Sequence, residues 1–217
     1  MPKPNAAARS PKRFVWRTTA AWSGLVVALA CSDTTSPGEN TGLTAPDDST
    51  APTIVTRGPE APPLETYQTA FWAVQGRQTT VRINYLAPDV NDSLSGSLQK
   101  FLVLTIPPGA QIVPPGNQPL AHGDSLQMTL TLDTVAMEAT LQPHGTIFAS
   151  AVPLQLSIWY VYADLPFEVG APGSETLGLW YQSEDGEPWE PLVSSLDQRG
   201  SALIAELTHF SNYAVAF

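Results

Sequence analysis

Three histidines are the residues of this chain best suited to binding a metal ion or moving a proton at neutral pH. They are His122, His144 and His209, and each lies in its own turn, far from the others in sequence. Structural zinc sites take their ligands from close pairs of Cys and His, and no such pair occurs here. We therefore expect no metal site on these histidines, and the sequence indicates no other cofactor.

Asp89, Asn91 and Asp92 form an acidic loop of the kind found in calcium sites. An EF-hand loop that began at Asp89 would need Gly at its sixth position and Glu at its twelfth. Leu94 and Lys100 occupy these positions, so we interpret the loop as a solvated turn. The chain also lacks the Gly-x-Ser-x-Gly nucleophile elbow and the glycine-rich phosphate loop. The sequence therefore does not indicate either of the two enzyme classes that these motifs mark.

Cys31 is the only cysteine, and it follows directly on a basic and then apolar N-terminus. The first 17 residues carry five basic side chains and no acidic one, and the stretch from 18 to 30 is apolar. This order is typical of a bacterial export signal. The stretch is shorter than the roughly 20 residues of a transmembrane helix. We expect residues 1–30 to be a cleaved signal peptide and the protein to be exported.

The residues before Cys31 read Ala-Leu-Ala, which resembles the lipobox of bacterial lipoproteins. The resemblance implies that the Cys31 thiol is lipidated, that Cys31 becomes the mature N-terminus, and that its acyl chains anchor the protein in a membrane. Ala28 stands where lipoboxes usually have Leu, so the same residues also suit the ordinary signal peptidase. Ser32 stands where inner-membrane retention signals often place Asp, which favours the outer membrane of the cell envelope.

The charge of the chain excludes one class of partner. Residues 1–30 hold five of the ten basic side chains and none of the twenty acidic ones, so their removal changes the formal charge from −10 to −15. So acidic a surface repels a phosphate backbone, and we expect no binding to nucleic acid. The charge either keeps an exported protein soluble or forms an acidic face for cations or basic partners.

Composition divides the remainder of the chain into two parts. Residues 31–67 are rich in Pro, Ser, Thr, Gly and acidic residues and poor in aromatic and large aliphatic ones. Such a segment buries too little apolar surface to offset the entropy of ordering, so we predict a disordered tether. Residues 68–217 are predicted to form the folded domain, because apolar and β-branched residues recur there in short runs.

These runs predict an all-β fold. The clearest alternation of apolar and polar residues occurs in 80–85, 125–132 and 154–158, as expected of strands with one buried face. No segment has a sustained helical period. About nine or ten strands separated by Pro/Gly turns favour one antiparallel β-sandwich. The predicted strands are residues 71–74, 80–85, 101–106, 125–132, 137–141, 154–158, 177–182, 202–208 and 212–217.

Three short motifs appear in order along this domain. They are Ile-Pro-Pro-Gly-Ala at residues 106–110, Gln-Pro-His-Gly-Thr-Ile-Phe at residues 142–148, and His-Phe-Ser at residues 209–211. Together they resemble the ZU-five domain, which occurs in zonula occludens proteins, netrin receptors and ankyrins. Gln142 departs from the family, which often has Gly there. The resemblance implies a β-sandwich with a binding or scaffolding role and no substrate.

Some ZU-five relatives break their own chain between Phe and Ser of a His-Phe-Ser tripeptide. The resemblance thus implies that the Ser211 hydroxyl would attack the carbonyl of Phe210 while His209 assists the proton transfer. The alternative is structural: the tripeptide links two strands, His209 is a partly buried polar residue, and Tyr213 belongs to the core. We favour the structural interpretation, so the chain is not expected to be an enzyme, and self-cleavage stays an alternative.

Two tryptophans offer a further alternative. Side chains alternate between the faces of a strand, so Trp159 falls on the polar face with Gln155 and Ser157, and Trp180 falls opposite Leu179. Two outward rings on nearby strands would form a flat platform for a sugar ring. The chain is thus predicted to be an envelope-anchored interaction module. Its partner is an unidentified protein, or a glycan bound through the tryptophans.

Overall fold

The computed structural model describes residues 51–86, 100–149, 152–172, 175–184 and 186–217, and all structural statements concern these residues. The signal peptide and the lipidation of Cys31 were predicted for residues that lie outside this set. The acidic loop with Asp89, Asn91 and Asp92 also lies outside it. Among the described residues no helix is long and apolar enough to cross a bilayer.

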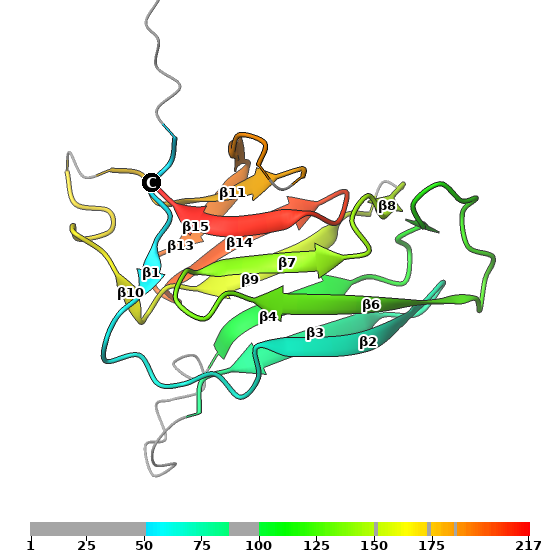
Figure 1. Cartoon of the computed structure of the whole chain (residues 1–217), viewed down its shortest axis with the longest axis horizontal. Coiled ribbons are helices and arrows are strands. Elements are labelled where there is room, and N and C mark those ends of the chain that lie inside the picture. The colour runs from blue at the N-terminus through cyan, green and yellow to red at the C-terminus, as the bar shows by residue number, and fades with distance from the viewer. Residues whose placement is uncertain (1–50, 87–99, 150–151, 173–174, 185) are drawn as a thin grey trace, which may run out of the picture. The chain divides into compact units, whose positions relative to one another are not determined.

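Two antiparallel sheets contain eleven of the fifteen strands in the described part of the chain (Figure 1). The larger sheet has the spatial order β12 (Glu190–Leu192), β11 (Gly178–Gln182), β15 (Asn212–Ala216), β7 (Glu138–Gln142), β6 (Ser125–Leu132) and β2 (Gln68–Val74). The smaller has the order β13 (Ser194–Asp197), β14 (Ala202–Leu207), β9 (Leu154–Trp159), β4 (Lys100–Ile106) and β3 (Thr79–Asn84). Two short pairs join β1 (Thr56–Arg57) to β10 (Ala163–Asp164) and β5 (Ile112–Val113) to β8 (Ile147–Phe148).

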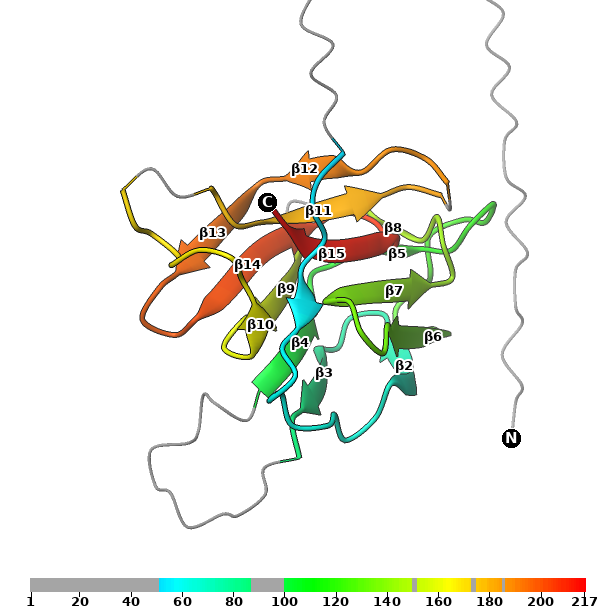
Figure 2. The same cartoon turned by 60° about the vertical axis from the view of Figure 1, so that its left-hand side comes forward.

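The two sheets pack face to face over one core (Figure 2). Strand β6 shows how the sequence produces this arrangement, because Met128, Leu130 and Leu132 are buried while the residues between them are partly or fully exposed. The inner faces of both sheets contribute to a single hydrophobic cluster, whose largest members include Tyr213, Phe101 and Phe210. The predicted all-β antiparallel sandwich is therefore confirmed.

Each of the nine predicted segments overlaps a strand of one of the two large sheets. The strands missed in the sequence are β1, β5, β8, β10, β12 and β13, which have two to four residues each. Strands this short show too few residues for a period of two to be recognised. They form because a neighbouring strand offers paired backbone groups.

The folded domain begins earlier than predicted. Val55 is 1% exposed and Leu64 is 4% exposed, and both belong to the core. The backbone N–H of Thr53 donates to the carbonyl of Phe217 at 2.9 Å, and the N–H of Val55 donates to the carbonyl of Val215 at 2.9 Å. The predicted boundary between tether and domain at residue 67 is therefore wrong. Val55 and Leu64 lie in a segment without a regular apolar pattern, yet both fill positions in the core.

Candidate functional site

The three motif segments lie side by side at one end of the sandwich. The N–H of Phe148 donates to the carbonyl of Thr208 at 2.8 Å, and the N–H of Phe210 donates to the carbonyl of Thr146 at 2.9 Å. The rings of Phe148 and Phe210 are 5.0 Å apart between centroids. The first motif ends at the buried Ala110 and joins this group through β5, the strand that follows it, which pairs with β8.

The Phe210–Ser211 bond is buried inside this end of the domain. Phe210 is 1% exposed and Ser211 is fully buried. The Ser211 hydroxyl donates a hydrogen bond to the carbonyl of Gln182, and the Ser211 carbonyl accepts one from Leu141 N–H at 3.0 Å. The carbonyl of Phe210 accepts a hydrogen bond from Gly145 N–H at 3.3 Å. The hydroxyl that would act as nucleophile is thus held by a carbonyl on another strand.

His209 is half-buried beside two tyrosines. Its ring packs edge-on against Tyr181, with 5.4 Å between centroids, and its Nδ1 lies 3.4 Å from the hydroxyl of Thr208. Burial lowers the pKa of His209, so the ring is neutral at neutral pH. The Tyr213 hydroxyl donates to the carbonyl of His209 at 2.6 Å, and Tyr213 lies in the core, as the structural interpretation of this segment expects.

The contacts of the His-Phe-Ser segment favour a structural role. Within the described part of the chain, no hydrogen bond joins the His209 ring to Ser211 or to the carbonyl of Phe210. Ser201 is the one non-glycine residue with a positive φ among the residues described, so left-handed backbone strain does not occur at Phe210 or Ser211. The segment closes the end of the sheet, and self-cleavage stays a prediction.

The other two histidines lie in different places. The ring of His122 lies against Gly76, where an added Cβ would meet its Nδ1 at 2.2 Å. The Nε2 atom of His144 is buried without a hydrogen-bond partner. In the ranges that the structure covers, no group of three or more His, Cys, Asp or Glu gathers in a way that could hold a metal ion.

Trp159 and Trp180 do not share a surface. Strand β9 belongs to the five-stranded sheet and β11 to the six-stranded sheet, so their outward faces point away from each other. The Nζ atom of Lys100 lies 5.2 Å from the ring centroid of Trp159, and the neighbouring Ser157 is buried. The prediction of one platform on nearby strands is therefore wrong. Parity assigns a residue to a face of its strand, but it does not say which sheet contains the strand.

A groove crosses the outer face of the five-stranded sheet, and we call it the Glu206 groove. Two hollows of about 630 Å³ and 290 Å³ share Pro153, Gln155 and Glu206. Thr105, Gln155 and Glu206 are consecutive cross-strand partners on β4, β9 and β14, so they form a polar row across the floor. The apolar residues along the groove include Pro107, Val152, Pro153, Pro191 and Val193.

Exposed apolar side chains gather along this groove beside one carboxylate. Val193 is 92% exposed and Val152 is 43% exposed, and each lines one of the two hollows. The carboxylate of Glu206 has no ionic or hydrogen-bond partner among the described residues. The groove can therefore accept apolar side chains together with one cation. Sequence reasoning missed it because Pro153 and Val193 lie between strands and resemble ordinary loop residues.

Comparison of the chain with protein-family models, with curated proteins and with solved structures finds no match.

Proposed function

We propose that this chain is an exported lipoprotein of the cell envelope, anchored through Cys31 in the outer membrane, and that its β-sandwich binds another protein without turnover. The binding surface is the Glu206 groove. The observation that carries this proposal is the gathering of Val193 and Val152 beside the unpaired carboxylate of Glu206. The three motifs that resemble the ZU-five domain are in keeping with a scaffolding role.

The chemistry of the groove indicates the kind of segment that it binds. Burial of an exposed Val side chain contributes about 1.5–3 kcal/mol. The carboxylate of Glu206 would attract a Lys or Arg of the partner and would fix its position along the groove. A partner segment with apolar side chains on either side of one basic residue satisfies both features. The acidic charge of the chain would speed its approach.

A site-specific cross-link tests this assignment. A photoreactive amino acid is placed at position 193 in the groove or at position 135, since Val193 and Val135 are both exposed and Val135 lies outside the groove. We expect an adduct of defined mass in the envelope from position 193 only, and we expect Glu206→Lys to abolish it. Equal adducts from both positions, or none from position 193, would refute the proposal.

The anchor is tested by the intact mass of the full chain purified from membranes. A mature N-terminus at Cys31 carrying several acyl chains supports the lipoprotein assignment, and an unlipidated mass would contradict it. The same spectrum reports on self-cleavage. We expect residues 211–217 to be present. Their loss from the wild type but not from Ser211→Ala would instead support self-cleavage by His209 and Ser211.

A further inference from the structure

The two large sheets have four edge strands, and three of them carry features that discourage pairing with another chain. Strand β12 has three residues and includes Pro191, and β13 has four residues and ends at Asp197. Strand β3 carries the exposed Arg82, and its pairing with β4 changes register between Ile83 and Asn84. Just after this strand, Tyr85 pairs with Leu64. Short length, charge, proline and bulges are the usual protections of sheet edges.

Strand β2 has none of these protections. It is seven residues long and reads Gln-Thr-Ala-Phe-Trp-Ala-Val, without charge or proline. Its neighbours on the outer face of β6 are Gln127, Thr129 and Thr131, which are also uncharged. An unprotected edge of this length is a template for a further strand.

The pairing of β2 with β6 determines which backbone groups face the open edge. The carbonyl of Tyr67 accepts from Leu132 N–H at 2.8 Å, and the N–H of Gln75 donates to the carbonyl of Asp124 at 2.8 Å. In an antiparallel ladder the paired residues alternate, so odd-numbered residues from 67 to 75 bond to β6. The even-numbered residues direct their N–H and C=O groups to the edge.

Only the centre of this edge is free. Gln68 N–H and C=O are both bonded to the hydroxyl of Thr66, at 3.2 Å and 2.6 Å. The carbonyl of Val74 accepts from Arg77 N–H at 3.0 Å. Ala70 and Trp72 therefore offer the two complete donor and acceptor pairs of the edge, and no described residue bonds to them there.

We propose that two copies of this chain pair through their β2 strands, antiparallel, about a two-fold axis at Phe71. In this register Ala70 of each copy lies opposite Trp72 of the other. Both residues then exchange N–H and C=O bonds, so four hydrogen bonds satisfy every complete pair on the edge. A shift by two residues would place Gln68 or Val74 opposite a free residue, where their groups are already engaged. The contact closes on itself, so it gives a dimer and not a filament.

The charges near the edge fit the same arrangement. Residues 65–78 contain two charged side chains, Glu65 and Arg77, which lie six residues before and six residues after Phe71. Antiparallel pairing about Phe71 brings Glu65 of one copy to the end where Arg77 of the other lies. Opposite charges therefore meet at both ends of the contact, while the acidic remainder of each copy stays outside it.

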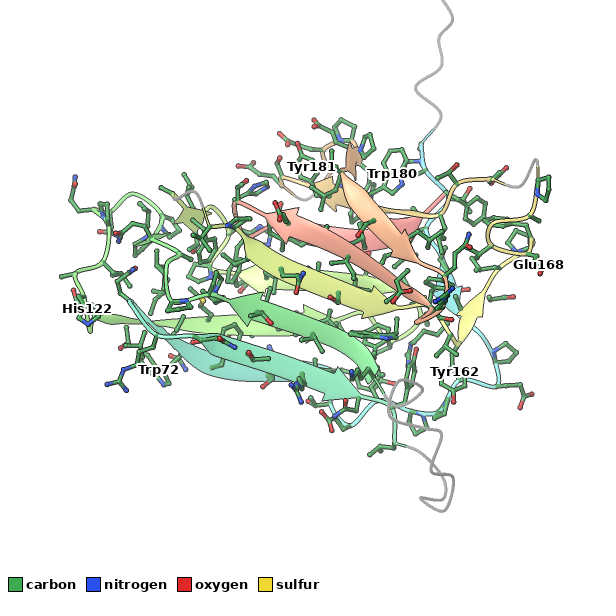
Figure 3. The ribbon with its side chains drawn as sticks, turned by 180° about the vertical axis from the view of Figure 1, so that it is seen from behind. Trp72, His122, Tyr162, Glu168, Trp180 and Tyr181 are labelled. Atoms are coloured by element: carbon green, nitrogen blue, oxygen red, sulfur yellow. The ribbon has the colours of Figure 1, made fainter. Side chains whose placement is uncertain are left out.

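The side chains at the centre are complementary in size. Trp72 is 59% exposed, and Figure 3 shows it projecting from the sandwich. The Cβ atom of an alanine directly opposite would lie about 4.5–5.5 Å away and would leave room for the indole ring. The two Trp72 residues would be diagonal neighbours at about 7–8 Å, within reach of an aromatic contact. The pairing would thus bury the largest exposed side chain of the edge.

Sedimentation equilibrium of the full chain, purified in a density-matched detergent, tests the pairing. We expect the protein mass of a dimer for the wild type. Trp72→Lys adds a charge to the edge and should weaken the dimer at least about tenfold. Ala70→Pro removes only an N–H that faces the edge, so it should weaken the dimer while β2 stays paired with β6. Gln127→Lys is the matched control, because it adds the same charge opposite Trp72 on β6 and should leave the dimer intact.

Two results would overturn this inference. One is a wild-type chain that sediments as a monomer. This result includes a single copy of the chain that co-purifies with a different protein bound at β2 and no longer binds that protein in Trp72→Lys. The other is a dimer that persists in both Trp72→Lys and Ala70→Pro. Because β2 lies in the six-stranded sheet and the Glu206 groove lies on the five-stranded sheet, neither result bears on the proposed binding surface.

Discussion

Two buried tyrosines differ in whether their hydroxyl group has a partner. The hydroxyl of Tyr213 donates to the carbonyl of His209 at 2.6 Å, whereas the hydroxyl of Tyr85 is buried with no hydrogen-bond partner. Both rings are otherwise well packed, and Tyr85 lies edge-on to Phe101 and Tyr162 at 5.5 Å and 4.7 Å. Replacing each tyrosine by phenylalanine removes one oxygen atom and leaves the ring in place.

The two substitutions should have opposite effects on the free energy of unfolding. Tyr213→Phe removes a hydrogen bond and leaves the His209 carbonyl short of a donor, which costs about 1–3 kcal/mol. Tyr85→Phe removes a buried oxygen atom that has no hydrogen-bond partner in the folded protein, so it should stabilise the protein by up to about 1 kcal/mol. Burial raises the pKa of both phenols, so neither is ionised at neutral pH and charge does not enter the comparison.

Urea unfolding of the purified protein measures both effects. We expect the midpoint to fall for Tyr213→Phe and to stay or rise for Tyr85→Phe, with the same slope as the wild type. In a thermal scan, a domain of this size should shift by about 2–4 °C for each kcal/mol. An equal loss of stability in Tyr85→Phe and Tyr213→Phe would contradict this prediction. It would mean that the Tyr85 hydroxyl is hydrogen-bonded as well as that of Tyr213.

Two further predictions concern buried polar groups. Burial lowers the pKa of His209 below its ordinary 6.5, so its contribution to stability is complete above about pH 6.5 and is lost as the pH falls through the lowered value. His209→Gln should therefore flatten the pH dependence of urea unfolding between pH 7 and 4, and an unchanged slope would contradict this. The side chain of Gln75 accepts from Ile112 N–H at 2.8 Å and donates to the carbonyl of Ala110 at 3.0 Å. Gln75→Leu should lower the free energy of unfolding by about 2–4 kcal/mol, because it leaves both backbone groups buried and unpaired; a smaller loss in urea unfolding than for Tyr213→Phe would count against it.

Local pattern predicted much of the sandwich. Segments such as 125–132 alternate so regularly that the observed strand β6 has the same bounds as the predicted one. Residues 51–67 were misassigned because their place in the fold depends on pairing with β15, which lies far along the chain. Composition measures how much apolar surface a segment has, but it does not show that a distant strand supplies partners for its backbone.

The candidate site was less accessible to sequence reasoning. The face of Trp159 and Trp180 follows from parity, but the order of strands in two sheets is a non-local property. The Glu206 groove likewise combines turns near residues 107, 152 and 193 that are distant in sequence. Each turn alone is unremarkable, and only the packing of β4, β9 and β14 brings them together.

The position of β15 determines when the larger sheet can form. This strand comes last in the described order, yet it lies between β11 and β7, and its five residues are all buried. Without it, β11 and β12 have no connection to β7, β6 and β2 within that sheet. A chain that emerges from its N-terminus first therefore cannot complete the sheet until residues 212–216 have followed. During synthesis, the strands on either side of this position therefore keep an unpaired edge until β15 is added, and such an edge is prone to aggregation.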